Sequence, residues 1–256
     1  MKKIILSGAN GKMGHVIASF VKEKSDCEIV AGIDRNTKTY DDFPIFAVPA
    51  QCTIKADCII DFSHPSLLNP ILEYAAHTST PIVVATTGIS NEQIALMRKT
   101  SELVPVFSSF NMSLGVNLLL ELARKAATVL GHDFDIEIVD KHHNQKVDAP
   151  SGTAIMLADA INHAQSDCYE YKYDRHSKRE KRSKSEIGMH SIRGGTIVGE
   201  HDVIFAGKDE IITLSHTAMS KEIFATGAVN AAVYLAGKPA GLYDMGDLVG
   251  MQNPAE

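Results

Sequence analysis

The fold of this chain is decided near its start by the stretch Lys2-Lys3-Ile4-Ile5-Leu6-Ser7-Gly8-Ala9-Asn10-Gly11-Lys12-Met13-Gly14. Residues 2–7 form an apolar run of strand length, and residues 15–21 read as a helix. A glycine turn between a strand and a helix lets the backbone approach a pyrophosphate and lets the helix pack closely on the strand. The Gly-x-x-Gly-x-x-Gly spacing is a variant of the usual dinucleotide motif, and in this context it predicts a dinucleotide-binding turn.

An acidic residue follows the next expected strand, residues 27–33. Asp34 stands 20 residues after Gly14, where a dinucleotide fold places a carboxylate for the adenosine ribose hydroxyls. Arg35 beside it could hold a 2′-phosphate instead. The two side chains therefore predict cofactor binding and leave NADH and NADPH both open.

Strand and helix patterns continue to alternate, with expected elements at residues 56–62, 67–77, 81–85, 91–99 and 104–109. Repeated units of this kind predict an α/β fold, a Rossmann-like doubly wound parallel sheet whose ligand crevice lies over the carboxyl ends of the strands. Thr86, Thr87, Gly88 and Asn111 follow such ends and are candidates to line the nicotinamide side. A plain helix-start turn would explain Thr-Thr-Gly equally well.

The pattern changes after Ser113. A long helix is expected at residues 114–130, and two long alternating segments, residues 187–205 and 210–214, follow without a helix between them. This arrangement predicts a second α+β domain with a mixed or antiparallel sheet. The dinucleotide-binding domain is therefore expected to comprise 1–113 and 223–256 and the substrate and oligomerisation domain 114–222, with hinges near 112–114 and 221–224.

The densest chemistry lies in Asp140-Lys141-His142-His143-Asn144-Gln145-Lys146-Val147-Asp148-Ala149-Pro150-Ser151-Gly152-Thr153. A strand is expected before it and a helix after it, so backbone N–H groups and a helix dipole should favour an anion there. Adjacent histidines at a strand end point to opposite sides. One could deliver a proton and the other contact a carboxylate. Lys146 is an anion anchor or a second acid, and Ser151, Gly152 and Thr153 would hold a carboxylate. A polar loop without catalysis would also explain the histidine pair.

Composition excludes several classes of protein. The net charge of −6 and the pI near 6.0 argue against nucleic acid as a main partner, and no apolar run approaches the roughly 20 residues that span a membrane. The four cysteines show no Cys-x-x-Cys spacing and are expected to be reduced thiols of a cytoplasmic protein. No third ligand at a familiar spacing supports a metal site. The basic tract of residues 172–184 is expected to be a solvated loop or, alternatively, a lid over an acidic substrate.

Several motifs together resemble the 4-hydroxy-tetrahydrodipicolinate reductase (dihydrodipicolinate reductase) family of the bacterial diaminopimelate–lysine pathway. The resemblance spans nearly the whole chain and rests on residues 8–14, 85–88, 111–117, 142–153, 193–201 and 224–228. Ala85 stands where glycine is expected, and Met112 where some members carry phenylalanine.

The resemblance implies NAD(P)H-dependent reduction of a cyclic, unsaturated dicarboxylate with loss of water, by a homotetramer. It implies that His142 is the proton donor, that Lys146 is a second donor, and that His143, Gly152 and Thr153 contact the substrate. The implied cofactor contacts are Gly8, Ala9, Asn10, Gly11, Lys12, Met13, Asp34, Arg35, Thr86, Thr87, Gly88, Ser109, Phe110, Asn111 and Met112.

Two other functions stay open at this point. One is a different two-domain dehydrogenase, acting on a sugar or an amino acid with the same cofactor half. The other is a redox sensor without catalysis, which would bind a protein or nucleic acid through the basic tract.

Overall fold

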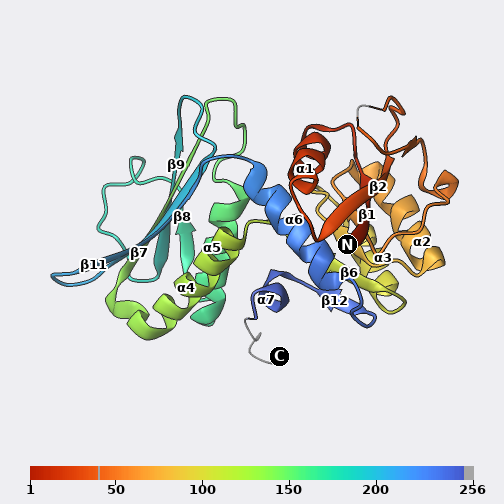
Figure 1. The fold of residues 1–256 in the computed structure, drawn as a ribbon. Helices are drawn as coiled ribbons and strands as arrows, with labels where there is room; N and C mark the ends of the chain where they lie inside the picture. The colour runs from red at the N-terminus through yellow and green to blue at the C-terminus, as the bar shows by residue number, and fades with distance from the viewer. Residues whose placement is uncertain (40, 251–256) are drawn as a thin grey trace. The chain divides into compact units, whose positions relative to one another are not determined.

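The computed structural model describes residues 1–39 and 41–250, and these divide into two compact units (Figure 1). The first unit comprises Met1–Leu114 together with the chain from Glu222 onward, and the second comprises Gly115–Lys221. The chain therefore passes between the units twice, after Leu114 and after Lys221, within the segments where hinges are expected.

A seven-stranded sheet, parallel throughout, organises the first unit. In the order β12-β6-β5-β4-β1-β2-β3, its strands are Gly241–Tyr243, Pro105–Ser108, Ile82–Val84, Cys58–Asp61, Lys2–Ser7, Cys27–Ile33 and Ile45–Phe46. The order reverses between β1 and β4, which is the point where doubly wound sheets bind ligands. The predicted Rossmann-like class is confirmed.

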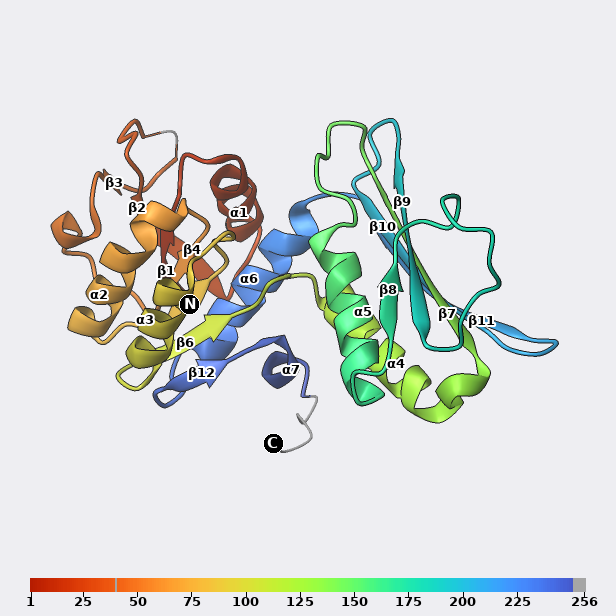
Figure 2. The ribbon, with the colours of Figure 1, turned by 180° about the vertical axis from the view of Figure 1, so that it is seen from behind.

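Helices cover both faces of this sheet because successive side chains of each strand point to opposite faces. Ile4 and Leu6 of β1 pack in one core cluster with α1 (Lys12–Lys22) and α6 (Glu222–Leu235). Ile5, between them, packs in another cluster with α2 (Leu68–Thr78) and α3 (Asn91–Ser101). Figures 1 and 2 show the two pairs of helices on opposite sides of the sheet. Short 3-10 turns at Pro49–Gln51 and Pro65–Leu67 precede β4 and α2.

The second unit contains a five-stranded sheet in the order β11-β10-β7-β9-β8. These strands are Ile211–Ala218, Gly199–Ala206, Asp135–His142, Glu186–Arg193 and Glu170–Lys172. β7 runs parallel to β9 and antiparallel to β10, so the predicted mixed sheet is confirmed. Buried residues of α4 (Leu114–Leu130) and α5 (Gly152–Ala164) share its core cluster, and a 3-10 turn at Gly131–Asp133 joins α4 to β7.

Some predicted boundaries are wrong. The single segment expected at residues 187–205 is two strands, because the chain turns at Gly194 and at Gly195, whose φ is +50° and therefore suits glycine. The segment expected at residues 210–214 continues to Ala218. The expected C-terminal tail is instead β12, an edge strand paired with β6, followed by the short helix α7 (Met245–Leu248).

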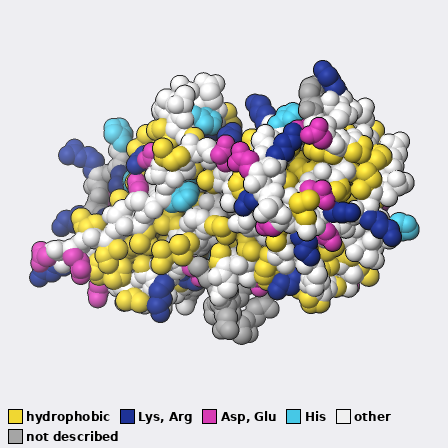
Figure 3. Space-filling model, viewed as in Figure 1, with side chains coloured by type: hydrophobic (Ala, Val, Ile, Leu, Met, Phe, Trp, Pro, Cys, Tyr) yellow, Lys and Arg dark blue, Asp and Glu magenta, His cyan; other side chains and the backbone are white. Residues whose placement is uncertain are grey.

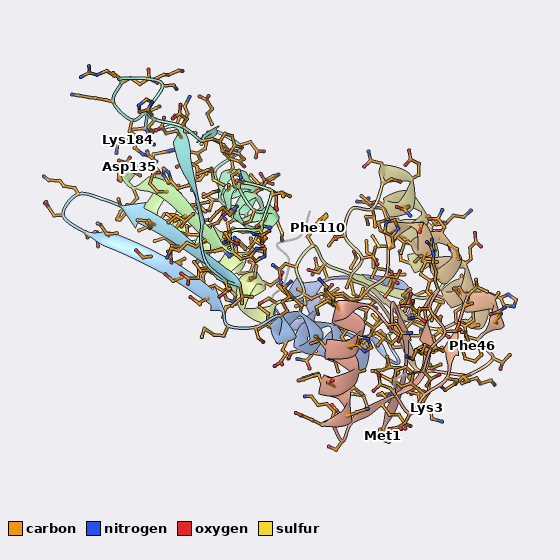
Figure 4. The ribbon with its side chains drawn as sticks, turned by 90° about the horizontal axis from the view of Figure 1, so that it is seen from above. Met1, Lys3, Phe46, Phe110, Asp135 and Lys184 are labelled. Atoms are coloured by element: carbon orange, nitrogen blue, oxygen red, sulfur yellow. The ribbon has the colours of Figure 1, made fainter. Side chains whose placement is uncertain are left out.

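The basic tract is an exposed loop, as expected, and several of its cations are paired. Residues 173–185 contain no helix or strand, but the Arg182 guanidinium bonds the carboxylates of Asp135 (3.1 Å) and Glu137 (3.0 Å). Arg175 pairs with Glu186 at 2.6 Å, and Lys184 reaches Asp135 at 3.2 Å (Figure 4). Carboxylates of β7 and β9 therefore neutralise three of the tract's cations, which weakens its interpretation as a charged lid.

Candidate active site

The glycine turn at the end of β1 has the geometry that a pyrophosphate requires. Gly8 has a φ of +79°, and a Cβ there would lie 2.5 Å from the carbonyl oxygen of Phe62. A Cβ on Gly14 would lie 2.3 Å from the carbonyl oxygens of Gly8 and Ala9, so helix and turn can meet only at glycine. Gly11 is the N-cap of α1 and has no side chain to cap the helix. The first N–H groups of α1 are thus available for an anion, and a dinucleotide fits this turn.

The predicted ribose carboxylate lies at this turn. Asp34 accepts hydrogen bonds from the backbone N–H of Asn10 and of Asn36, each at 3.0 Å. The side chain of Asn10 bonds the carbonyl oxygens of Asn36 and Lys38, so it holds the loop together. Arg35 donates to Ser66 Oγ at 3.0 Å.

A cleft of about 710 Å³ opens beside this turn. Of the predicted cofactor residues, Gly8, Gly11, Asp34, Arg35 and Thr87 line it. The sequence analysis missed the residues from the end of β4 and after it, which are Phe62, Ser63, His64, Pro65 and Leu67. The sequence did hold a signal for these residues. Ser63-His64-Pro65 follows the end of one strand in the same way as Thr86-Thr87-Gly88 follows the end of the next, and such positions line the ligand crevice.

A second cavity, of about 800 Å³, lies in the same unit over the ends of β5, β6 and β12. Thr86, Thr87, Gly88, Ser109 and the largely exposed Phe110 line it (Figure 4). The C-terminal segment adds Leu242, Tyr243, Asp244 and Asp247, which the sequence analysis missed because it took that segment for a tail. The structure thus brings the two predicted strand-end loops together.

Other predicted cofactor residues are used structurally. The hydroxyl of Thr86 donates to Asp61 Oδ2 at 2.7 Å, and burial raises the pKa of this Asp61 carboxyl. Met112 is buried, and its carbonyl packs against Gly227 of α6, where a Cβ would collide with it. Asn111 Oδ1 accepts the Ser113 N–H at 2.9 Å. Ala9 is buried, whereas Lys12 and Met13 lie in the first turn of α1.

In the second unit, strand pairing assembles the predicted proton donor's surroundings. His142 is the last residue of β7, because the ladder with β9 extends as far as the pair His142–Arg193. The strand expected to end before Asp140 is therefore longer, and the first histidine stands at its end. The same ladders place Ser191 on one side of Asp140 and His201 on the other. The ring of His201 meets that of His142 edge-on, with centroids 5.2 Å apart.

Asp140 is the centre of this cluster, although the sequence analysis gave it no role. Its fully buried carboxylate accepts hydrogen bonds from His142 Nδ1 (3.0 Å), Arg193 Nη1 (2.6 Å), Ser191 Oγ (2.8 Å) and the Ser151 N–H (3.0 Å). Burial acts to raise the pKa of Asp140, but these donors outweigh it, and the pKa lies below its usual range. The alternation of acidic and apolar residues in β7 was a signal that only one acid, Asp140, shares the face of His142.

The other predicted substrate residues follow β7. His143 is partly exposed, and its carbonyl oxygen accepts the Lys146 N–H at 3.1 Å. Lys146 Nζ pairs with Asp148 at 2.9 Å and lowers the pKa of that carboxyl. Arg193 adds a second cation, since it donates to the carbonyl of Asp148 at 2.7 Å as well as to Asp140.

Helix α5 begins beside this cluster. Ser151 is its N-cap and accepts the Ala154 N–H at 3.2 Å, while the same hydroxyl lies 3.0 Å from His201 Nε2. Gly152 is exposed and Thr153 is half-buried at the first two positions of the helix. A Cβ on Gly152 would meet no described atom within 4 Å, so the approach to the helix start is open.

The two histidines are held neutral by their surroundings. Burial lowers the pKa of His142, and Lys146 and Arg193 lower it further, although the hydrogen bond to Asp140 opposes them. Burial and the neighbouring His142 lower the pKa of His201 to about 4. A bound anion beside Lys146 would favour the charged form of His142, which suits a group that takes up and delivers a proton.

A Rossmann-type sheet with a glycine turn that fits a dinucleotide, joined to a unit that carries a histidine on a carboxylate beside an open helix start, defines a two-domain dinucleotide-dependent oxidoreductase. Comparison with known proteins names the family. A family model described as "Dihydrodipicolinate reductase, N-terminus" matches residues 2–112, and a second one, described as "Dihydrodipicolinate reductase, C-terminus", matches residues 115–249.

Individual relatives agree. The chain is 51% identical over 249 residues to a 4-hydroxy-tetrahydrodipicolinate reductase of Caldanaerobacter subterraneus subsp. tengcongensis, covering 97% of this chain and 98% of that protein. A solved structure, dipicolinate-bound dihydrodipicolinate reductase from Paenisporosarcina sp. TG-14, has a TM-score of 0.78 at 24% identity and covers 95% of this chain and 97% of that one. A myo-inositol dehydrogenase of Lactobacillus casei has a TM-score of 0.62 at 14% identity, over 97% and 90% of the two chains. The last two likenesses show the fold alone.

The chain therefore belongs to the dihydrodipicolinate reductase family, and it is an NAD(P)H-dependent oxidoreductase. Among the described residues, no group of three or more His, Cys, Asp or Glu side chains could hold a metal ion. None of the helices in residues 1–39 and 41–250 is long and apolar enough to cross a membrane.

Proposed function

We propose that this enzyme reduces 4-hydroxy-tetrahydrodipicolinate to tetrahydrodipicolinate in lysine and diaminopimelate biosynthesis. One hydride and one proton are added to the ring and one water leaves. The dinucleotide supplies the hydride when it is bound. The observation that carries the proposal is the cluster at the end of β7, where a histidine on a buried carboxylate stands beside two cations and an open helix start.

In this proposal His142 delivers the proton. It ends β7, its unperturbed pKa is near 6.5, and its own surroundings lower that value until an anion binds. Lys146, three residues after His143, is the second candidate donor and the one lysine between His143 and Pro150. A lost general acid typically slows an enzyme by about 10²–10⁴-fold.

A dicarboxylate would be held by the groups around the start of α5. Lys146 exchanges its Asp148 partner for a substrate carboxylate, and the N–H groups of Gly152 and Thr153 donate hydrogen bonds to the same carboxylate at the positive end of the helix. His143 contacts the second carboxylate. Ser151 stays a predicted contact, although its hydroxyl already caps α5 and bonds His201. The structure from Paenisporosarcina holds dipicolinate, which is a compound of this class.

The cofactor would lie along the carboxyl ends of the first sheet. The pyrophosphate meets the turn of residues 8–13, and Asp34 and Arg35 line the cleft for the adenosine ribose. Residues 86–88, Ser109 and Phe110 line the cavity proposed for the nicotinamide end, while Asn111 and Met112 would act by shaping the backbone of that loop. Asp34 favours free ribose hydroxyls and Arg35 favours a 2′-phosphate, so we expect both NADH and NADPH to serve.

Replacing Arg35 by alanine should raise the KM for NADPH about tenfold or more and leave the KM for NADH nearly unchanged, because a charge-assisted bond to phosphate is worth roughly 1.5–3 kcal/mol. Initial rates with each cofactor measure this. Ser66→Ala is the matched control, since it removes the hydrogen-bond partner of Arg35 and keeps the cation. Equal losses with both cofactors would contradict the assigned role.

The reaction itself is tested by oxidation of NADH and NADPH with freshly generated 4-hydroxy-tetrahydrodipicolinate. Rapid loss of nicotinamide absorbance is expected, with no turnover of sugars or amino acids. Turnover of myo-inositol instead would favour the sugar dehydrogenase alternative, whose fold is shared. The redox-sensor alternative requires binding without turnover, and three cations of its basic tract are already paired with carboxylates.

We also propose that the enzyme is a homotetramer in the cytoplasm, as the family resemblance implies. Alternation along the strands places Ile192 and Ile211 on the face of the second sheet opposite Met189 and Leu214, which pack in the core with α4 and α5. Figure 3 shows hydrophobic side chains gathered on the surface of the second unit. The four cysteines are free thiols, in keeping with a reducing compartment.

Sedimentation equilibrium should give the mass of four chains, and Ile211→Asp should give smaller species. A monomeric wild-type protein would contradict this proposal.

A further inference from the structure

Asp140 has no unused acceptor position. A carboxylate offers about four lone-pair sites, and four donors occupy them: the ring nitrogen Nδ1 of His142, the guanidinium of Arg193, the hydroxyl of Ser191 and the backbone N–H of Ser151. These donors come from both neighbouring elements, β9 and α5, as well as from β7 itself. The carboxylate therefore cannot rotate without breaking several bonds at once.

This arrangement determines the tautomer of His142. An ionised carboxylate accepts hydrogen bonds and donates none, and the donors around Asp140 keep its pKa below the usual range. The hydrogen bond between Asp140 and His142 therefore requires a proton on Nδ1. In the neutral imidazole, Nε2 is then the nitrogen without a proton, so Nε2 is the one that takes up a proton and gives it away.

The space beside Nε2 depends on a glycine. Gly199, the first residue of β10, lies beside it, and a Cβ there would stand 3.2 Å from Nε2. The ring of His201 approaches from another side, edge-on. Asp140 thus holds one nitrogen of the imidazole, while the absence of a side chain at Gly199 leaves room at the other.

We propose that Asp140 is a positioning residue that assigns proton delivery to Nε2 of His142 and aligns this nitrogen with the start of α5. The alignment follows from the shared carboxylate, because the Ser151 N–H and the Nδ1 proton of His142 both end on Asp140. Arg193 extends the same control to the loop, since it bridges Asp140 and the carbonyl of Asp148 beside Lys146. This inference rests on the proposed role of His142 as the proton donor.

The tautomer is measured directly by long-range proton–nitrogen NMR of the full-length protein labelled with ¹⁵N-histidine, assigned by comparison with His142→Gln. A neutral His142 with its proton on Nδ1 is expected. A proton on Nε2 would overturn the proposal. The NMR measurement needs no substrate, so its result holds even if the enzyme acts on a different compound. The turnover assay separately tests the proposed function.

Asp140→Asn should move the proton, because the amide can donate to Nδ1 and leave it as an acceptor. We expect kcat to fall about 10- to 100-fold for a misassigned proton donor. The limb of the kcat/KM–pH profile that reports the pKa of His142 should shift to lower pH. The substitution removes the Asp140 anion, which favours the charged form of the ring, while Lys146, Arg193 and His201 still face it. An unchanged tautomer and pH limb in a folded variant would contradict the assigned role.

Two further variants separate positioning from mere stability. Ser191→Ala removes one donor from the same carboxylate without touching His142, so the tautomer should persist and kcat should fall much less than in Asp140→Asn. Gly199→Ala should lower kcat and leave the tautomer unchanged, because it crowds Nε2 and not Nδ1. If Asp140→Asn does not fold, the wild-type tautomer and Gly199→Ala decide the question. Full activity in Gly199→Ala would overturn the assignment of Nε2.

Discussion

Replacing His142 by glutamine is expected to lower kcat by about 10²–10⁴-fold, the range for loss of a general acid. Glutamine keeps a side chain that can bond Asp140 but has no group that titrates near neutral pH. The binding groups around the start of α5 stay in place, so the KM for the dicarboxylate should change little. Steady-state rates with saturating NADH measure both constants.

The neighbouring histidine provides a matched control. His143→Gln makes the same chemical change one residue along the chain, after β7 has ended, where the side chain is partly exposed and lies outside the Asp140 cluster. We expect His143→Gln to raise KM and to leave kcat within a small factor. If the two variants lose kcat equally, the assignment of the proton to His142 is wrong.

Replacing Lys146 by alanine is expected to lower kcat/KM by about 10–10³-fold, with much of the effect in KM, because a charge-assisted bond to a carboxylate contributes roughly 1.5–3 kcal/mol and a second proton source is lost as well. Initial rates over a range of dicarboxylate concentrations separate the two parts. An unchanged KM would refute the anchoring role.

Two variants test how Lys146 acts. Lys146→Arg keeps the cation and should retain substrate binding while losing any proton delivery, since guanidinium does not release a proton in this pH range. Asp148→Asn removes the present partner of Lys146 and should leave KM unchanged or lower it, because the ammonium no longer has to exchange a carboxylate. A higher KM in Asp148→Asn would show that the ion pair itself holds the loop in its binding form.

Much of the first unit could be predicted because its signals are local. Gly8 and Gly14 sit where a side chain would collide with the backbone, and such positions are visible as spacing in the sequence. Asp34 and Arg35 follow directly after the last residue of β2, as expected. The edge strand β12 could not be predicted, since Gly241–Tyr243 is short and becomes a strand through pairing with β6, more than 130 residues earlier in the chain.

In the second unit, too, local features could be predicted and long-range contacts could not. Strand β7, the cap at Ser151 and helix α5 follow from patterns within about fifteen residues, which hydrophobic periodicity and capping chemistry describe well. The basic tract was harder to interpret, because Arg175 and Arg182 form ion pairs with carboxylates on β7 and β9. The sequence of the tract itself gives no sign of these partners.

The amino-acid sequence by itself determined the family, the alternation of the main strands and helices of the first unit, and the histidine and lysine proposed to act on the substrate. These features depend on short-range spacing and on motifs that stand intact in the chain. Tertiary structure alone decided the environment of His142. Asp140 meets Ser191 and Arg193 because β7 pairs with β9 in one register, and His201 faces Asp140 because β10 pairs on the other side. A shift of one residue in either ladder would turn these side chains to the opposite face. Long-range hydrogen bonding, which no local pattern specifies, therefore sets the chemistry of the site.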